Sequence, residues 1–353
     1  MTDSLREYLD FHLGVSGRIQ AFQQRRMYSV ELEITNICNL SCRYCYASAN
    51  RKKAGLDDST VIKILEAMQR GGMKEVGWIG GEPLLVPDLY QWMRTATERG
   101  LDNVLYTNGL LIDATCAREL VTHCSTGRIV VHLDSVDYEH WSAGQMRPSR
   151  EKFEKNLHVL DRLVEAGYPA ERVIMSTPLT RSCYETLEET LALFASYGVR
   201  FINLIPLTPL GLSTDKNAFL SPEEIWNAMV MRSETLKMPE LMDLGICEYC
   251  KQFQMTDISV NCEGMVLPYI DYFHPTGSVY EEDLDILVER NFDALSLSGW
   301  VTPDTFGNRI RGYCSVCEHK AWCFGNPVSR EPVVMGEPDH DCLLVCQHEV
   351  DRG

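Results

Sequence analysis

The feature that most constrains the fold is a strand-then-helix alternation that runs from Tyr28 to Leu212. Six short runs rich in branched or aromatic residues recur along this stretch, and a segment with helical periodicity follows each of them. The six predicted strands are Val30–Ile34, Val76–Ile79, Val104–Tyr106, Ile129–Leu133, Val173–Ser176 and Phe201–Ile205. Six βα units in series predict an α/β protein with a parallel sheet, either a partial (β/α)6 barrel or a doubly wound sheet. In both arrangements functional residues lie just after the strands.

Helix start and stop signals support this alternation. A helix is predicted from Asp58 to the pair Gly71-Gly72, and another over residues 151–166, where apolar residues form one stripe up to Gly167. Capping boxes are predicted at two further helix starts, Ser182 with Glu185 and Ser221 with Glu224.

The sequence divides into three parts. Residues 1–27 have a polar, helical pattern, and residues 28–240 hold the βα units. Beyond about Met238 the regularity fails, turns multiply and cysteines become frequent, so residues 241–353 are predicted to form a separate domain.

Charge and hydropathy exclude several classes of partner. The chain has 33 Lys and Arg against 50 Asp and Glu, and its net charge of −17 disfavours nucleic acid and suits a cationic substrate. No uncharged apolar run approaches the roughly 20 residues that cross a bilayer, so no membrane association is expected. The first residues lack the pattern of a signal peptide, and we expect a cytoplasmic protein.

Cysteines are the most informative residues in the composition. There are 14, of which three lie within residues 38–45 and eight lie beyond position 246. Because the cytoplasm keeps thiols reduced, metal or redox chemistry is favoured over disulfides.

The first cysteine group is Cys38-x3-Cys42-x2-Cys45, which follows the first predicted strand directly. A structural zinc site would require a fourth ligand, and no further Cys or His lies nearby. An iron–sulfur cube can be held by three thiolates with one iron left open, although the spacing departs from that of ferredoxins.

This loop, with the aromatic Tyr44 before its third cysteine, resembles the signature of the radical S-adenosylmethionine (SAM) enzymes. Further family elements follow the later strands in order, with His132 in place of the more usual Ser of the Ser-x-Asp strand end. The residues that the resemblance assigns to SAM are Tyr44, Gly80, Gly81, Glu82, Pro83, Thr107, Asn108, Asp134, Ser135, Arg147 and Ser176.

The resemblance implies a [4Fe–4S] cluster on Cys38, Cys42 and Cys45, with SAM on its open iron. It also implies that one electron, from a donor such as flavodoxin or ferredoxin, cleaves SAM to a 5′-deoxyadenosyl radical. That radical would abstract a substrate hydrogen.

The C-terminal cysteines resemble the SPASM/twitch extension of the same family, which binds one or two auxiliary [4Fe–4S] clusters. The resemblance assigns eight ligands, and structural zinc remains an alternative because a two-residue cysteine gap suits that metal too. The eight are Cys247, Cys250, Cys262, Cys314, Cys317, Cys323, Cys342 and Cys346.

Cys183 is a candidate catalytic residue. It follows the fifth predicted strand, where the capping box would place it at the first helical position, and a helix N-terminus favours the thiolate. A thiol can also return a hydrogen atom to a carbon radical, and return from the opposite face inverts a stereocentre. The alternative is that Cys183 is a buried cysteine without a catalytic role. Cys116 and Cys124 are likewise expected to pack as small apolar residues.

Cys183 makes the chain similar to the radical SAM epimerases of aminoglycoside biosynthesis. The preferred hypothesis is therefore epimerisation of a cationic amino sugar, with Asp134, Asp215 and Asp271 as candidate binding carboxylates. An alternative is an anaerobic alcohol dehydrogenase with an auxiliary cluster as electron acceptor. A further alternative is a peptide- or protein-modifying SPASM maturase, ranked lower because the 37 residues before Cys38 are too few for a leader-recognition domain. The βα core argues against a simple electron carrier.

Overall fold

The computed structural model describes residues 3–50, 54–207, 211–243, 256–268 and 275–297. The chain divides by its internal contacts into two units. One comprises residues 29–220 with 261–264, and the other comprises residues 1–28, 221–260 and 265–353. The boundaries after residues 27 and 240 stay predictions.

The larger unit is built on six parallel strands, and all six predicted strands are confirmed. They pair in the order β6-β5-β4-β3-β2-β1, which is the order of the sequence. A doubly wound sheet reverses its order at a switch point, so this sequential order corresponds to the barrel alternative. The strands are β1 (Ser29–Glu33), β2 (Glu75–Ile79), β3 (Asp102–Thr107), β4 (Arg128–His132), β5 (Val173–Leu179) and β6 (Phe201–Pro206).

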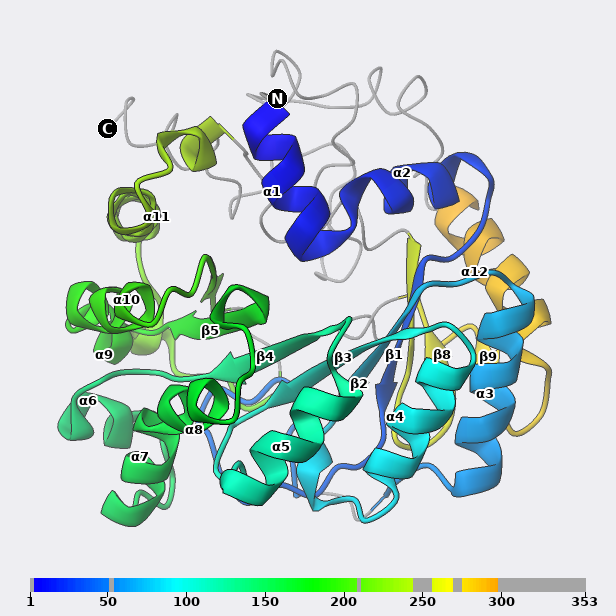
Figure 1. Cartoon of the computed structure of the whole chain (residues 1–353), viewed down its shortest axis with the longest axis horizontal. Helices are drawn as coiled ribbons and strands as arrows, with labels where there is room; N and C mark the ends of the chain where they lie inside the picture. The colour runs from blue at the N-terminus through cyan, green and yellow to red at the C-terminus, as the bar shows by residue number, and fades with distance from the viewer. Residues whose placement is uncertain (1–2, 51–53, 208–210, 244–255, 269–274, 298–353) are drawn as a thin grey trace. The chain divides into compact units, whose positions relative to one another are not determined.

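Helices follow the strands and cover the sheet. Figure 1 shows α3, α4, α5 and α8 side by side along it. The bounds are α3 (Asp58–Arg70), η1 (Pro83–Leu85), α4 (Leu89–Glu98), α5 (Ala114–His123), α6 (Tyr138–Ala143), α7 (Arg150–Leu157), α8 (Val159–Glu165), η2 (Ala170–Arg172), α9 (Arg181–Tyr184), α10 (Leu187–Ser196) and η3 (Lys216–Ala218). Aspartates cap α3, α5 and α6 by accepting backbone N–H bonds, which satisfies donors that a helix start leaves unpaired.

Two helix predictions are wrong. The helix expected over residues 151–166 is broken at His158, whose φ of −94° and ψ of 19° separate α7 from α8. The capping box of Ser182 with Glu185 does not form. Thr180 caps α9 by accepting from the Cys183 N–H, and Ser182 Oγ donates to the His140 carbonyl instead.

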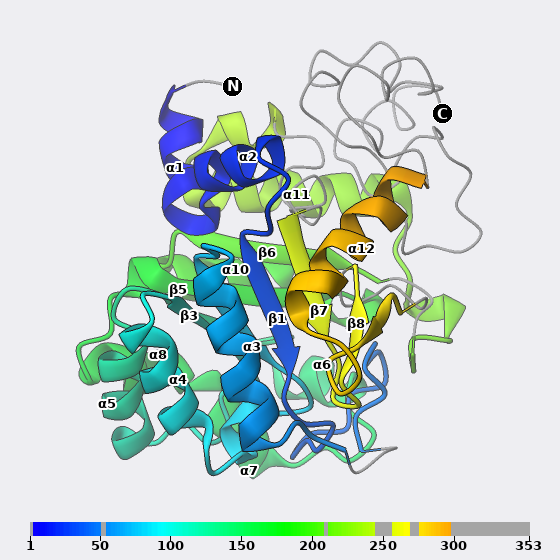
Figure 2. The same ribbon diagram turned by 90° about the vertical axis from the view of Figure 1, so that its right-hand side faces the viewer.

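The second unit holds the N-terminal helices and the described part of the C-terminal region apart from residues 261–264. Its capping box at Ser221 and Glu224 is confirmed. The short strands β7 to β9 pair antiparallel, and α12 lies beside β7 and β8 in Figure 2. Just before β9, the Thr276 carbonyl accepts from the Arg290 guanidinium of α12. The elements are α1 (Asp3–Leu13), α2 (Val15–Gln23), α11 (Pro222–Leu236), η4 (Pro239–Asp243), β7 (Asp257–Val260), β8 (Met265–Leu267), β9 (Gly277–Ser278) and α12 (Leu284–Leu297).

Three buried tryptophans anchor the core of the larger unit, and each indole N–H finds an acceptor. Trp78 donates to Asn103 at 2.8 Å, and Trp141 donates to Asn156 at 2.9 Å. Trp92 donates to Asp58 at 2.7 Å. Buried indoles that keep a hydrogen bond fix the register of the helices against the sheet. Within the described residues no helix is both long and apolar enough to span a membrane.

Candidate active site

The cysteine loop that follows β1 is held against the end of β2 by two glycines. The Gly81 N–H donates to the Thr35 carbonyl at 2.6 Å, and the Glu82 N–H donates to the Ile37 carbonyl at 2.8 Å. A Cβ atom on Gly81 would lie 2.2 Å from the Ile37 oxygen, and one on Gly80 would lie 2.4 Å from the Thr35 oxygen. Only glycine permits this close approach of two backbones.

Residues Cys38, Cys42 and Cys45 are each partly exposed, and their thiols are close enough to influence one another. Burial, with lesser contributions from neighbouring carboxylates and thiols, raises the pKa of Cys38 to about 11 and that of Cys42 well above its usual value. Such thiols ionise when a cation compensates the charge.

Across the described ranges, no three His, Cys, Asp or Glu side chains surround a point that could hold a single metal ion. A four-iron cube binds each thiolate through a different iron, so its ligands do not converge on one ion. Three thiols on one loop are therefore a suitable donor set for such a cube.

Glu82 is completely buried at the centre of the site. Its carboxylate accepts from Thr107 Oγ1 at 2.7 Å, from the Asn108 N–H at 2.8 Å and from the Leu84 N–H at 3.1 Å. Burial raises the pKa of Glu82 to about 7 despite these donors. Both carboxylate oxygens thus join the ends of β2 and β3, and the expected contact with the SAM amino group stays a prediction.

Asn108 connects the end of β3 to the cysteine loop. Its side-chain amide donates to Asn39 Oδ1 at 2.7 Å and lies 3.7 Å from Cys38 Sγ. Its carbonyl accepts from Asn156, which also donates to the His132 carbonyl at 2.8 Å. The buried Asn156 amide thereby joins the ends of β3 and β4.

Tyr44 connects the same loop to the end of β4. Its hydroxyl donates to Asp134 Oδ2 at 2.6 Å and lies 2.9 Å from His132 Nε2. Burial and then the Asp134 charge raise the pKa of Tyr44 well above its ordinary value. His132, which occupies the place of the usual serine, is therefore part of a polar group with Tyr44 and the buried Asp134, whose Oδ1 lies 2.6 Å from His132 Nε2.

The remaining predicted SAM residues lie in different surroundings. Ser135 is buried and pairs with Thr186 at 2.7 Å, and the buried Ser176 accepts from the Leu133 N–H at 3.1 Å through its carbonyl. Pro83 begins η1, whereas Arg147 is exposed to solvent.

Cys183 is buried, with 1% of its surface exposed. Burial, followed by the nearby Asp134 charge, raises the pKa of the Cys183 thiol far above its ordinary value. The expectation that the helix start favours a thiolate is therefore wrong. The four-residue helix α9 offers little dipole, and desolvation prevails.

A cavity of about 300 Å³ lies beside Tyr44 and the residues that flank Cys183. Charged side chains of both signs line it, with Arg43 and Arg181 against Glu185 and Asp215. Asp215, one of the proposed substrate carboxylates, is thus at the site. The other lining residues are Ala143, Gly144, Thr180, Ser182, Leu207, Ser213, Asn217 and Ala218.

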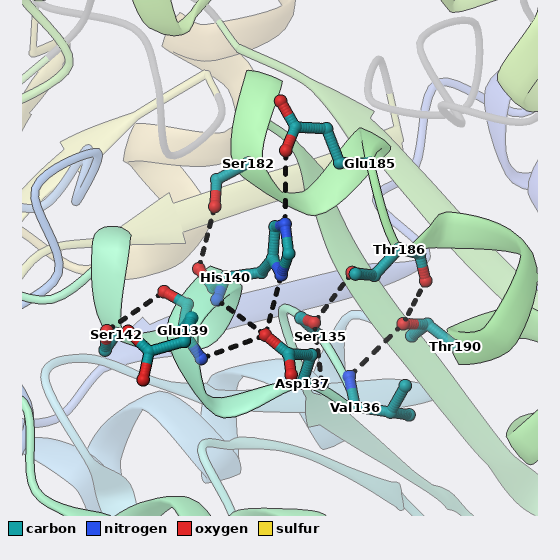
Figure 3. Close-up of polar contacts among 10 residues, drawn as sticks. All are labelled: Ser135, Val136, Asp137, Glu139, His140, Ser142, Ser182, Glu185, Thr186 and Thr190. Carbon is teal, nitrogen blue, oxygen red and sulfur yellow. Dashed lines mark hydrogen bonds and ion pairs between the residues drawn. The ribbon is translucent and has the colours of Figure 1, made fainter.

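His140 contacts Glu185, which lines the cavity, and the sequence interpretation missed this histidine. Figure 3 shows its ring between Asp137 and Glu185, at 2.7 and 3.1 Å. The hydrogen bond with Asp137, followed in effect by that with Glu185, raises the pKa of His140. The Asp-x-x-His spacing at a helix start could have predicted the contact of His140 with Asp137. The contact with Glu185 could not be predicted, because the two residues are brought together only by the fold.

Most predicted auxiliary ligands lie outside the described residues, as does Asp271. Cys262 is described. Its N–H donates to Glu33 Oε2 at 3.1 Å, and burial raises the pKa of its thiol to about 12. The predicted ligands outside the described part are Cys247, Cys250, Cys314, Cys317, Cys323, Cys342 and Cys346.

Comparison with known proteins gives a consistent result. Residues 32–205 match the radical SAM superfamily. The mycofactocin maturase MftC of Mycobacterium tuberculosis is 27% identical over 335 residues, which are 88% of this chain and 81% of MftC. The sporulation killing factor maturation protein SkfB of Bacillus subtilis is 24% identical over 208 residues, or 59% of this chain and 48% of SkfB. The chain thus spans about half the length of SkfB.

Solved structures resemble the fold over most of the chain. Streptococcus suis SuiB bound to the precursor peptide SuiA superimposes with a TM-score of 0.70 over 93% of this chain and 80% of SuiB. The sequences are 14% identical, so the likeness concerns the fold.

Proposed function

Because the chain belongs to the radical SAM superfamily through residues 32–205, we propose that it is a SPASM-type enzyme that modifies a peptide. The observation that carries this proposal is the loop of Cys38, Cys42 and Cys45, held at the carboxyl ends of β1 to β4 beside a cavity. Relatives named as maturases, and a similar fold bound to a precursor peptide, support a peptide substrate.

In this proposal Cys38, Cys42 and Cys45 hold a [4Fe–4S] cluster whose open iron takes SAM. When bound, the cluster and SAM supply a carbon-centred radical that removes a hydrogen atom from the substrate. A flavodoxin or ferredoxin is the proposed electron donor, and further clusters are proposed for the C-terminal cysteines.

The protein's own residues orient these groups. Gly80 and Gly81 set the distance between the cysteine loop and the end of β2. Tyr44 fixes the loop against Asp134, and it is one of the residues that line the cavity. The cavity is of a size that takes a single side chain or a small molecule, so it suits one residue of an extended peptide.

The charges around the cavity suit a peptide better than a polycation. Two arginines and two carboxylates line it, and a site built for an amino sugar would need mainly carboxylates. The comparisons likewise give no support to an aminoglycoside substrate, and the preference for epimerisation of an amino sugar is replaced by peptide modification.

A second candidate function rests on Cys183. A buried thiol that keeps its proton has an S–H bond available for transfer to a carbon radical, and the residues around Cys183 line the cavity. Epimerisation of a peptide or sugar centre with Cys183 as donor is therefore the alternative. The dehydrogenase alternative depends on an auxiliary cluster whose cysteines, apart from Cys262, lie outside the described residues.

The test uses full-length protein reconstituted without oxygen in D2O, with SAM and a reductant. A pool of synthetic peptides and a panel of aminoglycosides are the probes. Peptide modification predicts 5′-deoxyadenosine together with a peptide that has lost hydrogen or formed a crosslink. Epimerisation predicts a product of unchanged oxidation state that carries one solvent deuterium. Turnover of an aminoglycoside and of no peptide would overturn the proposal.

A further inference from the structure

Gln145 lies in a segment that pairs with the cysteine loop. The proposed function assigns this segment no role. The Arg43 N–H donates to the Gly144 carbonyl at 2.9 Å, and the Met146 N–H donates to the Ser41 carbonyl at 2.8 Å. These two bonds form an antiparallel bridge that sets Gln145 opposite Cys42.

The Gln145 side chain is directed at the Cys42 sulfur. Its Nε2 lies 3.5 Å from Cys42 Sγ and 3.4 Å from Asp134 Oδ2, and only 2% of the residue is exposed. An amide nitrogen carries two hydrogens, so it can donate to both acceptors at once. Oε1 lies 3.6 Å from the same sulfur, where a protonated thiol can donate to it.

When a cluster is bound, Cys42 is a thiolate without a hydrogen, so its sulfur can only accept a hydrogen bond from Gln145. Nε2 is then the group that can bond to Cys42 Sγ, while its second hydrogen remains directed at Asp134. The amide also lies between the carboxylate and the sulfur, two groups that would otherwise repel each other.

We propose that Gln145 is a positioning residue that donates a hydrogen bond to the Cys42 thiolate and makes the cluster easier to reduce. This inference rests on the proposed function, because it requires a cluster on Cys42. Reduction adds negative charge to the cluster and its sulfurs, so an N–H donor stabilises the reduced state more than the oxidised state. Hydrogen bonds to the sulfurs are among the factors that set iron–sulfur potentials.

The test compares Gln145→Met, which keeps the length and removes both donors, with Gln145→Glu, which replaces the donor by a carboxylate. Gln91→Met on the exposed surface of α4 is the matched control. Each full-length protein is reconstituted without oxygen, and its reduction potential is measured by redox titration followed by electron paramagnetic resonance. Addition of SAM identifies the signal of the cluster with an open iron.

We expect Gln145→Met to lower the equilibrium constant for reduction by about tenfold, which is about 59 mV for one electron. Gln145→Glu should lower it further because of its charge, and Gln91→Met should leave it unchanged. An unchanged potential in iron-loaded Gln145→Met would overturn the inference. Loss of the cluster from both variants at position 145 would also overturn it, because a residue that only adjusts the reduction potential is not needed to bind the cluster. Failure of the proposed function differs from both, because the unmodified protein would then hold no SAM-responsive cluster.

Discussion

The Tyr44 hydroxyl donates a 2.6 Å hydrogen bond to Oδ2 of Asp134, and this bond ties the cysteine loop to the end of β4. Tyr44→Phe removes this donor and leaves Oδ2 of the buried carboxylate with the longer contact from Gln145, while His132 Nε2 stays 2.6 Å from Oδ1. We expect the free energy of unfolding of the metal-free protein to fall by about 2 kcal/mol, measured by urea denaturation. Tyr184→Phe is the control, and an equal loss there would contradict the assignment.

Gly81→Ala should displace the cysteine loop, because the added Cβ would lie 2.2 Å from the Ile37 oxygen. A backbone oxygen cannot move aside as a flexible side chain does. We therefore expect the free energy of unfolding to fall by roughly 3 kcal/mol and the protein to bind less iron. Gly71→Ala is the control, since its Cβ would meet its nearest neighbour at 3.4 Å. Full iron content in Gly81→Ala after anaerobic reconstitution would refute the prediction.

Glu82 should make the metal-free protein less stable as pH rises. Burial raises its pKa from 4.5 to about 7 in the folded state, so the folded protein binds more protons than the unfolded chain within that window. The free energy of unfolding therefore decreases as pH rises through the window and levels off above it. The total change is about 3 kcal/mol at about 1.4 kcal/mol per pKa unit.

Glu82→Gln removes this titration, although it lowers stability at every pH because an amide cannot accept from all three donors. Urea denaturation from about pH 5 to about pH 8 should show a smaller decline for the variant than for the unmodified protein. Equal slopes for the two proteins would show that another group is responsible.

Cys183 should resist alkylation in the folded protein. Its thiol is buried and its raised pKa keeps it protonated, whereas alkylating reagents attack an exposed thiolate. Iodoacetamide followed by peptide mass mapping should label Cys183 only after unfolding in urea. Labelling in the native protein as fast as in urea would exclude this state of the thiol.

The pKa of His140 should lie above the ordinary value for histidine because Asp137 and Glu185 both stabilise the imidazolium. Asp137→Asn removes the larger of these contributions and should lower the pKa, as followed by the imidazole proton resonances in nuclear magnetic resonance. Asp161→Asn, beside the exposed His158, leaves the surroundings of His140 intact and serves as the control. A pKa of His140 that does not respond to Asp137→Asn would contradict the contact in Figure 3.

The strands were predictable because a buried parallel strand leaves a short run of branched residues that no other element imitates. The six runs match β1 to β6 within a few residues. Local signals failed where two hydroxyl side chains could each accept from the first N–H groups of one helix. Thr180 precedes α9 and caps it, whereas Ser182 lies inside the helix and donates to the His140 carbonyl, a contact that only the fold shows.

The loop of the candidate site was also predictable, since its three cysteines are close in sequence. Its supports were not, because they come from distant segments. Gln145 is about a hundred residues from Cys42, and Asn156 joins two strand ends through a single amide. Neither hydrophobic periodicity nor residue spacing in the sequence predicts such contacts. The pKa of Cys183 was predicted in the wrong direction because sequence reasoning saw a helix start and missed its burial.

The different exposure of the thiols has a consequence for handling the protein in air. Residues Cys38, Cys42 and Cys45 are each partly exposed, so oxygen and peroxide should reach the loop first and convert its sulfurs to disulfides or sulfenic acids once iron is lost. Cys183 is sealed from the same oxidants and remains reduced. Damage should therefore begin at the loop, where reductant and fresh iron can reverse its early stages, while the interior sulfur survives unaltered.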